Sequence, residues 1–74
     1  MTNNIHFINQ CKIELNEEIE QHRLKGLSTQ LTIFMLFNVY HALLCDKAYC
    51  KSLKHEFRTK YNILKSMTND LSNK

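Results

Sequence analysis

Proline and tryptophan are absent from this 74-residue chain, and it contains a single glycine. Proline and glycine are the residues that most strongly mark turns, so their scarcity argues for helices joined by few turns. A chain of this length forms one domain, and such a domain buries only about 60% of its unfolded surface. Its stability therefore needs a further support, such as disulfides, a metal or a second chain.

Cysteine is also scarce. Cys11, Cys45 and Cys50 cannot all pair within one molecule, and their spacing is neither a C-x-x-C pair nor a secreted disulfide framework. Residues 1–4 lack the positive start of a secretory signal peptide, and no apolar stretch follows them. We therefore expect buried thiols in a reducing compartment and a cytoplasmic location.

Charge is missing from the middle of the chain. Residues 27–45 contain no Lys, Arg, Asp or Glu, and twelve of these nineteen residues are apolar or aromatic even without Cys45. A helix that is apolar almost all round must be buried or lie in a membrane. So short a chain has little other surface with which to cover it. We therefore expect a protein partner, either a second copy of the chain or a different protein.

Apolar residues recur at helical spacing in three segments, which predicts an all-α fold in a single domain. The predicted helices span about residues 4–25, 28–45 and 47–70, and the polar tail, 71–74, is expected to fray. No residue breaks the chain between the second and third helices. The fold is therefore either a small three-helix unit or a long helical hairpin, with a very apolar central helix.

Three of the predicted helix ends carry residues that such ends favour. Gly26 fits the left-handed position that stops the first helix. Ser28 or Thr29 can cap the second helix, and Asp46 can cap the third. The short segment between Gly26 and Thr29 favours an antiparallel arrangement of the first two helices.

The central helix is long enough to cross a bilayer, because nineteen uncharged residues can span it. However, Gln30, Asn38 and His41 lie within this segment, and basic residues flank it on both sides. Polar side chains within a span are costly, and symmetric basic flanks give no orientation. We therefore expect a buried helix and consider membrane association unlikely.

The first and third helices are too short to cover the whole apolar surface between Leu31 and Leu44. This excess predicts a homodimer or an obligate complex formed through the central helix. The residues predicted to contact the partner are Ile33, Leu36, Phe37, Tyr40 and Leu44.

Asn38 is an isolated amide within the apolar helix, and burying it is costly unless it is hydrogen-bonded. In helical oligomers a buried Asn can pair with its symmetry mate and fix the register. His41, one turn later, would extend the same polar seam. The alternative is that both residues lie on the exposed edge of the helix.

Basic residues line one edge of the predicted third helix: Lys47, Lys51, Lys54, Arg58 and Lys65. Cations at this spacing can contact successive phosphates of a nucleic acid or steer an acidic protein partner, and they can also be a solvated face. Residues 47–74 hold seven basic and two acidic side chains, whereas residues 1–26 hold three basic and four acidic ones. Such asymmetry favours antiparallel pairing of the two ends or an acidic partner.

Chemistry-bearing motifs are weak. His41 and Cys45 are four residues apart on one helix face, an acceptable chelating step, but a structural zinc site needs four ligands and Cys50 and His55 rotate off that face. The same pair lacks an orienting acid and an oxyanion donor, and no glycine-rich phosphate loop is present. We therefore expect no catalytic residue, no metal and no cofactor.

The residues thus favour a non-enzymatic protein-protein interaction module, such as a small bacterial adaptor, a secretion co-chaperone or a phage-type inhibitor. The alternative function is a small dimeric regulator that binds nucleic acid through the basic edge of the third helix. Abundant Asn, Lys and Ile are a compositional hint of an AT-rich bacterial or phage genome.

Overall fold

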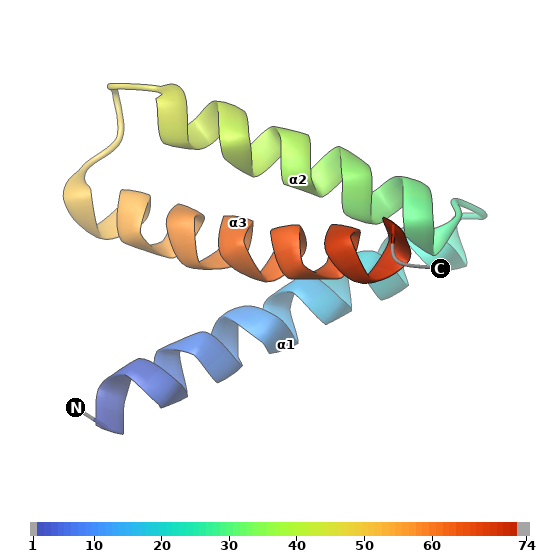
Figure 1. Cartoon of the computed structure of the whole chain (residues 1–74), viewed down its shortest axis with the longest axis horizontal. Helices are drawn as coiled ribbons and strands as arrows, with labels where there is room; N and C mark the ends of the chain where they lie inside the picture. The colour runs from blue at the N-terminus through green and yellow to red at the C-terminus, as the bar shows by residue number, and fades with distance from the viewer. Residues whose placement is uncertain (1, 73–74) are drawn as a thin grey trace.

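The computed structural model describes residues 2–72, and the side chains of residues 5–71. Within residues 2–72 the chain forms three helices and no strand, which confirms the predicted all-α fold as a three-helix unit (Figure 1). The helices are α1 (Thr2–Leu24), α2 (Thr29–Cys45) and α3 (Lys51–Ser72).

α2 and α3 are separate helices rather than one continuous arm. Asp46 adopts an extended backbone conformation, with φ −79° and ψ 128°, so the helical winding stops there. Its carboxylate accepts a hydrogen bond from the N–H of Ala48 at 2.8 Å and stabilises the turn that follows. Asp46 therefore does not cap α3, which begins at Lys51 rather than at residue 47.

α3 continues to Ser72, beyond the end expected at residue 70. Leu71 is half-buried and packs against the core, so this last turn contributes apolar contacts. Residues 73–74, the remainder of the tail that was expected to fray, lie outside the described residues.

The chain reverses between α1 and α2 at its single glycine. The N–H of Gly26 donates to the carbonyl of Arg23, and the N–H of Leu27 donates to the carbonyl of His22, both at 3.0 Å. These two bonds satisfy carbonyls that the end of a helix leaves free. The φ of Gly26 is 93°, a conformation that a side chain would strain.

Ser28 begins α2. Its backbone is extended, and its hydroxyl accepts a hydrogen bond from the N–H of Leu31 at 3.0 Å. The hydroxyl of Thr32 donates to the carbonyl of Ser28 at 2.9 Å, which satisfies a buried side chain. This local chemistry confirms Ser28 as the cap, of the two candidates in the sequence.

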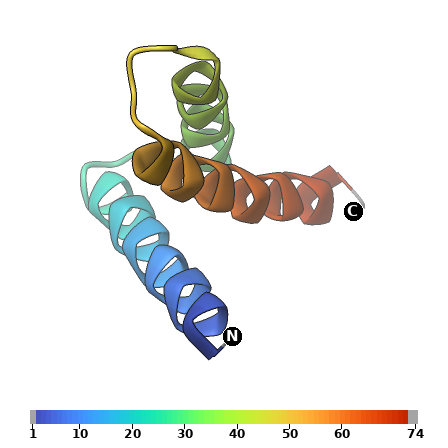
Figure 2. The same ribbon diagram turned by 90° about the vertical axis from the view of Figure 1, so that its left-hand side faces the viewer.

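α2 runs antiparallel to α3, and the two lie side by side along most of their length (Figure 1). α1 runs in the same general direction as α3 and crosses it at an angle, so the view in Figure 2 shows the two helices as the arms of a V. Phe7, near the start of α1, stacks on His55, near the start of α3, with ring centroids 4.9 Å apart.

The core is small. Among residues 5–71, the buried hydrophobic side chains are Cys11, Leu15, Ile33, Leu36 and Leu64. They come from all three helices, so each helix contributes to one shared core. Half-buried hydrophobic residues that pack against this core are Ile19, Phe37, Tyr40, Ile63, Met67 and Leu71. None of the helices within residues 2–72 has both the length and the apolar character needed to cross a membrane.

Candidate interaction surfaces

The residues predicted to contact a partner lie on the inner side of α2. Ile33 and Leu36 are buried, and Leu36 is only 3% exposed. Phe37, Tyr40 and Leu44 are half-buried. The interface prediction is therefore wrong for Ile33 and Leu36. The reason is that the most apolar strip of α2 is the strip that α1 and α3 cover within the same chain.

Aromatic contacts hold this inner strip against α3. Phe37 stacks on Tyr61, with ring centroids 4.8 Å apart and planes inclined by 15°. One turn later, the rings of Tyr40 and Phe57 are 5.9 Å apart. Offset aromatic pairs of this kind add to the free energy gained from burial. These aromatic contacts therefore stabilise the packing of α2 against α3.

The opposite side of α2 remains exposed and carries no charged residue. We define the outer face of α2 by seven exposed residues: Leu31, Phe34, Met35, Asn38, Val39, Ala42 and Cys45. Leu31 is 66% exposed, Val39 is 45% and Met35 is 41%. The excess of apolar surface that the sequence predicted is therefore present, but on the helix side opposite to the predicted one.

A shallow hollow lies at the amino-terminal end of this outer face. It measures about 270 Å³ and is lined by Leu27, Leu31, Thr32 and Met35. Leu27 lies in the turn before α2 and is 45% exposed. The apolar surface therefore extends past the first turn of α2.

Asn38 and His41 are both exposed in the single chain. The imidazole of His41 is 5.8 Å from the ring of Tyr61, on the side facing α3. Asn38 belongs to the outer face and is close to the middle of α2, which spans Thr29–Cys45. The monomer thus places both residues on the exposed edge, and the register role of Asn38 depends on a second chain.

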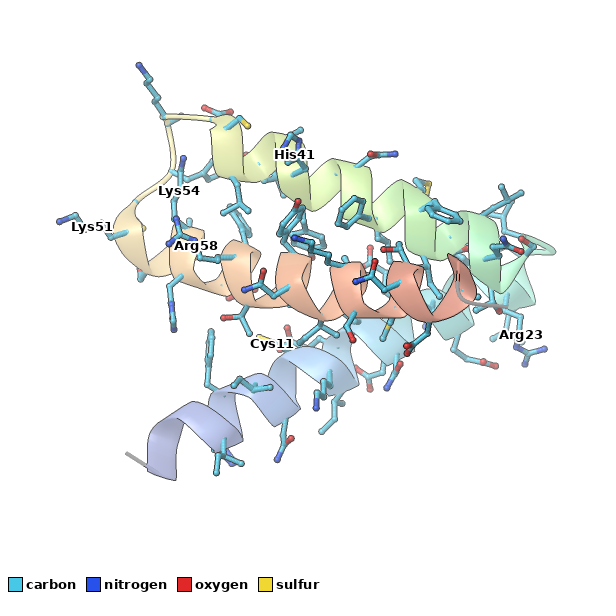
Figure 3. The ribbon with its side chains drawn as sticks, in the orientation of Figure 1. Cys11, Arg23, His41, Lys51, Lys54 and Arg58 are labelled. Carbon is cyan, nitrogen blue, oxygen red and sulfur yellow. The ribbon has the colours of Figure 1, made fainter. Side chains whose placement is uncertain are left out.

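Four of the five residues of the predicted basic edge line one concavity beside the turn between α2 and α3. The concavity measures about 470 Å³, and we call it the basic cleft. Its lining residues are Lys47, Tyr49, Lys51, Lys54, His55 and Arg58. Figure 3 shows Lys51, Lys54 and Arg58 gathered at this end of the molecule. Lys65 is exposed two turns further along α3 and is not part of the cleft.

Lys54 also has a structural contact. Its ammonium donates to the carbonyl of Leu44 at 2.7 Å. This carbonyl belongs to the last turn of α2, where carbonyl groups are free and the helix dipole attracts a cation. Lys54 therefore ties the end of α2 to the start of α3, which leaves Lys47, Lys51 and Arg58 as the exposed cations of the cleft.

Cys50 lies immediately before α3 and is exposed, as is Cys45, so the expectation of buried thiols holds only for Cys11. Its sulfur is 3.3 Å from the hydroxyl oxygen of Ser52. Hydrogen bonding by Ser52, and then by the N–H of Leu53, holds the pKa of the Cys50 thiol below its usual value. Cys50 therefore occupies the N-cap position of α3, which was predicted for Asp46.

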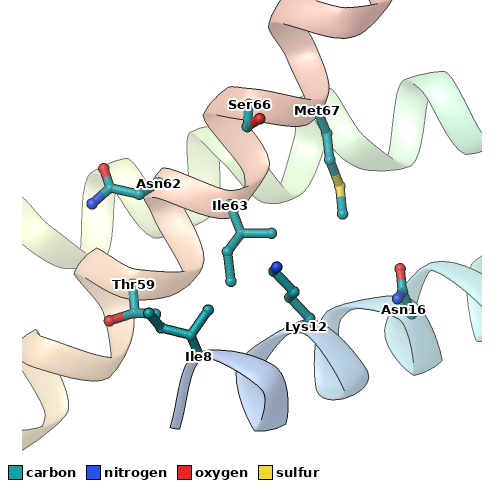
Figure 4. Close-up of a pocket in the computed structure, with 8 residues that line it drawn as sticks. All are labelled: Ile8, Lys12, Asn16, Thr59, Asn62, Ile63, Ser66 and Met67. Atoms are coloured by element: carbon teal, nitrogen blue, oxygen red, sulfur yellow. The ribbon is translucent and has the colours of Figure 1, made fainter. Parts of the chain in front are cut away.

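A groove separates α1 from α3 on the side away from α2. It measures about 500 Å³, with Ile8 and Lys12 on α1 facing Ile63 and Met67 on α3 (Figure 4). The exposed hydrophobic side chains of α1 include Ile5, Ile8 and Ile13. α1 is therefore packed less completely than α2 and α3.

The structure also reveals a buried cation that sequence reasoning counted only as part of the basic end. Lys60 is buried, and its ammonium lies 2.7 Å from a carboxylate oxygen of Glu14 and 3.1 Å from one of Glu56. Lys60 falls between Phe57 and Leu64 at steps of three and four residues. Its position within the apolar stripe of α3 is the sequence pattern that could have predicted the burial of Lys60.

Among residues 2–72, no group of three or more His, Cys, Asp or Glu side chains comes together in a way that would hold a metal ion. Comparison with known proteins gives no match: no family model, no curated protein and no solved structure is significantly similar to this chain. A functional assignment therefore has to come from the chain's own surfaces.

Proposed function

We propose that this chain is a non-enzymatic protein-protein interaction module that binds through the outer face of α2. The observation that carries the proposal is the absence of charge from α2 together with the exposure of Leu31, Met35 and Val39. An exposed helix face normally carries charged residues on its solvent side. A contiguous exposed apolar patch is characteristic of a surface that meets another protein.

The energetics favour association over solvation. Each apolar side chain removed from water contributes about 25 cal/mol per Å² of buried surface. The outer face buries no charge when it meets a partner, so no ion has to be desolvated. Leu31, Phe34 and Met35 supply the large side chains, and the hollow beside Leu27 accepts one from the partner. A small adaptor, a secretion co-chaperone or a phage-type inhibitor would use such a surface by helix association.

Site-specific photo-crosslinking tests this proposal. A benzophenone amino acid is placed at position 35 on the outer face, and a matched probe is placed at position 21 on the exposed side of α1. The proposal expects strong crosslinks from position 35, either between purified chains or in the expressing cell, and few from position 21. It also expects Leu31→Lys to remove them. Equal crosslinking from the two positions would contradict the proposal.

A second candidate function, binding of nucleic acid, is favoured by the basic cleft. Lys47 is exposed there in the turn before α3, and Lys51 and Arg58 are exposed two turns apart on α3. None of the residues that line the cleft is acidic. Phosphate contacts by such cations weaken steeply as salt displaces them. The cleft also contains Tyr49, whose ring packs edge-on against Phe57 with centroids 5.2 Å apart.

Fluorescence anisotropy with labelled single-stranded and duplex DNA and RNA tests this second function. Binding that weakens at least tenfold between 50 and 200 mM salt, on the order expected for several phosphate contacts, would support it. Lys51→Glu and Arg58→Glu should each weaken this binding, and together they should abolish it. Lys65→Glu is the matched control for each single substitution, because it changes the charge of the same helix by the same amount outside the cleft. Loss of binding in the control as well would mean that only net charge matters.

A further inference from the structure

We infer that the partner of the outer face of α2 is a second copy of this chain, packed antiparallel across a two-fold axis at Asn38. This inference rests on the proposed function and names the partner of the same surface. A two-fold dimer uses one patch on both copies, so the patch must be complementary to itself. Three properties of the outer face favour self-complementarity. It has large side chains at one end and small ones at the other, it has no charged residue, and it has a polar residue at its centre.

Large and small side chains lie at opposite ends of the outer face. Leu31, Phe34 and Met35 stand on the amino-terminal half, whereas Ala42 and Cys45 stand on the carboxy-terminal half. In an antiparallel pair centred on Asn38, Leu31 lies opposite Cys45 of the second copy, and Phe34 lies opposite Ala42. Large side chains then meet small ones at both ends. A parallel pair would instead place Phe34 against Phe34 and leave Ala42 opposite Ala42.

Neutrality makes the two copies compatible. α2 contains no Lys, Arg, Asp or Glu, so the paired faces bury no charge and suffer no like-charge repulsion. Antiparallel pairing also sets the positive end of one helix dipole beside the negative end of the other. The acidic and basic residues of the chain therefore lie outside the paired faces.

Asn38 makes the central contact favourable instead of costly. An amide has both donors and an acceptor, so two Asn38 side chains related by a two-fold axis can each donate to the other. A buried Asn that pairs in this way fixes the register of two helices. Any shifted register would bury both amides against apolar side chains and leave them without partners.

The length of the face sets the strength of the dimer. A helix of 17 residues is about 25 Å long, so one helix pair buries less than the standard 800 Å² or so per partner. The exposed side chain of Leu27, which lines the hollow beside Leu31, extends the contact only at its ends. We therefore expect a reversible dimer with a dissociation constant on the order of micromolar.

Analytical ultracentrifugation of the purified, reduced chain from about 1 to 500 μM, around the range set by this interface size, measures that constant. Met35→Lys should weaken the dimer at least tenfold. Ala42→Phe should do the same, because it places two large side chains opposite each other. Combining Phe34→Ala with Ala42→Phe exchanges the large and small sides and should restore the dissociation constant to within about threefold. Failure of the double variant to recover would contradict the pairing of Phe34 with Ala42.

Oxidative crosslinking locates the axis independently. In a background with Cys45→Ser and Cys50→Ser, Asn38→Cys should form a disulfide-linked dimer under mild oxidation, because residue 38 meets its own copy. In the unmodified chain Cys45 should not link to Cys45, since antiparallel pairing leaves these residues fourteen helical positions, or about 21 Å, apart. A Cys45–Cys45 disulfide would overturn the antiparallel arrangement.

The two experiments distinguish failure of the second-copy inference from failure of the proposed function. A chain that stays monomeric at 500 μM, while position 35 crosslinks to a different protein in the cell, overturns the second-copy inference and leaves the proposed function standing. A monomer whose position 35 crosslinks no better than position 21 overturns both. Circular dichroism of each variant confirms that helix content is unchanged, which is expected because the substituted positions are exposed.

Discussion

The ammonium of Lys60 lies 2.7 Å from a carboxylate oxygen of Glu14, and this ion pair joins α3 to α1. The Lys60 side chain is 9% exposed and also contacts Glu56, one turn back on its own helix. Burial alone would lower the pKa of Lys60, but hydrogen bonds to the two carboxylates outweigh it and raise the pKa above its usual value. Lys60 therefore remains charged inside the fold and orients α1.

Removing this charge should loosen α1. Lys60→Met keeps most of the side-chain volume and removes the ammonium, so the two carboxylates lose their shared partner. Because Glu14 and Glu56 are partly exposed and can rehydrate, we expect a loss of about 1–2 kcal/mol in the free energy of unfolding, less than for a fully buried pair. Urea unfolding measures it. Lys65→Met, at an exposed site of α3, should change stability by less than about 0.5 kcal/mol.

The same contact predicts an acid-dependent weakening. Hydrogen bonds from Lys60 and then from Gln10 hold the pKa of Glu14 below its usual value. A carboxyl whose pKa is lower in the folded state adds stability above its unfolded pKa, near 4.3, and this contribution is lost as the pH falls through the folded value. Wild type should therefore be more stable than Glu14→Gln at pH 7, and the difference should shrink below about pH 4.

Thermal melts of both proteins at half-unit pH steps measure this convergence. Glu17→Gln is the matched control, since Glu17 is an exposed acid on the same helix with no ion pair recorded for it among the described residues. A constant difference between wild type and Glu14→Gln from pH 7 to pH 3 would contradict the role given to Glu14.

The helices were predictable because each depends on local residues. Steps of three and four along the apolar stripes, the cap at Ser28 and the stop at Gly26 all act within one helix or one turn. The start of α3 was predicted wrongly. The carboxylate of Asp46 bonds to the N–H of Ala48 in the turn, and Cys50 occupies the position before α3.

The side of α2 that the chain itself covers was not predictable from the sequence of α2. Periodicity shows which residues share a face, but an apolar helix offers two faces and the sequence does not say which one the chain itself covers. The aromatic strip at Phe37 and Tyr40 pairs with Tyr61 and Phe57, which are distant in sequence. The burial of Lys60 likewise depends on Glu14, forty-six residues earlier.

Two leucines of α2 allow a direct test of which side of the helix is core and which is surface. Leu36 is 3% exposed and belongs to the core, whereas Leu31 is 66% exposed on the outer face. Leu36→Ala should lower the free energy of unfolding by about 2–4 kcal/mol, because it removes buried methyl groups and leaves a cavity. Leu31→Ala should change it by less than about 0.5 kcal/mol when measured at a dilution where the chain is monomeric.

Urea unfolding of the two variants at concentrations well below the expected dissociation constant gives both values. In the association assay we expect the reverse order: Leu31→Ala should weaken the proposed dimer, whereas any effect of Leu36→Ala should follow from its loss of fold. Similar destabilisation by the two substitutions would mean that the outer face is already covered within the chain.

Cysteine reactivity provides a readout of local structure that does not require association. Cys50 is exposed, and hydrogen bonding by Ser52 and Leu53 lowers the pKa of its thiol. Cys11 is buried, and burial raises the pKa of its thiol. The thiolate is the nucleophile, so alkylation by iodoacetamide at pH 7 should be fastest at Cys50 and slowest at Cys11.

Mass spectrometry of peptides from a timed alkylation resolves the three sites, with Cys45 as an exposed reference. Ser52→Ala removes the hydroxyl that lies 3.3 Å from the sulfur and should slow the reaction of Cys50 without altering that of Cys45. Alkylation of Cys11 should require opening of the core, so its rate should rise in Lys60→Met, where α1 is held less firmly. If Cys11 reacts as fast as Cys45 in the wild type, then α1 does not stay packed on α3 in solution.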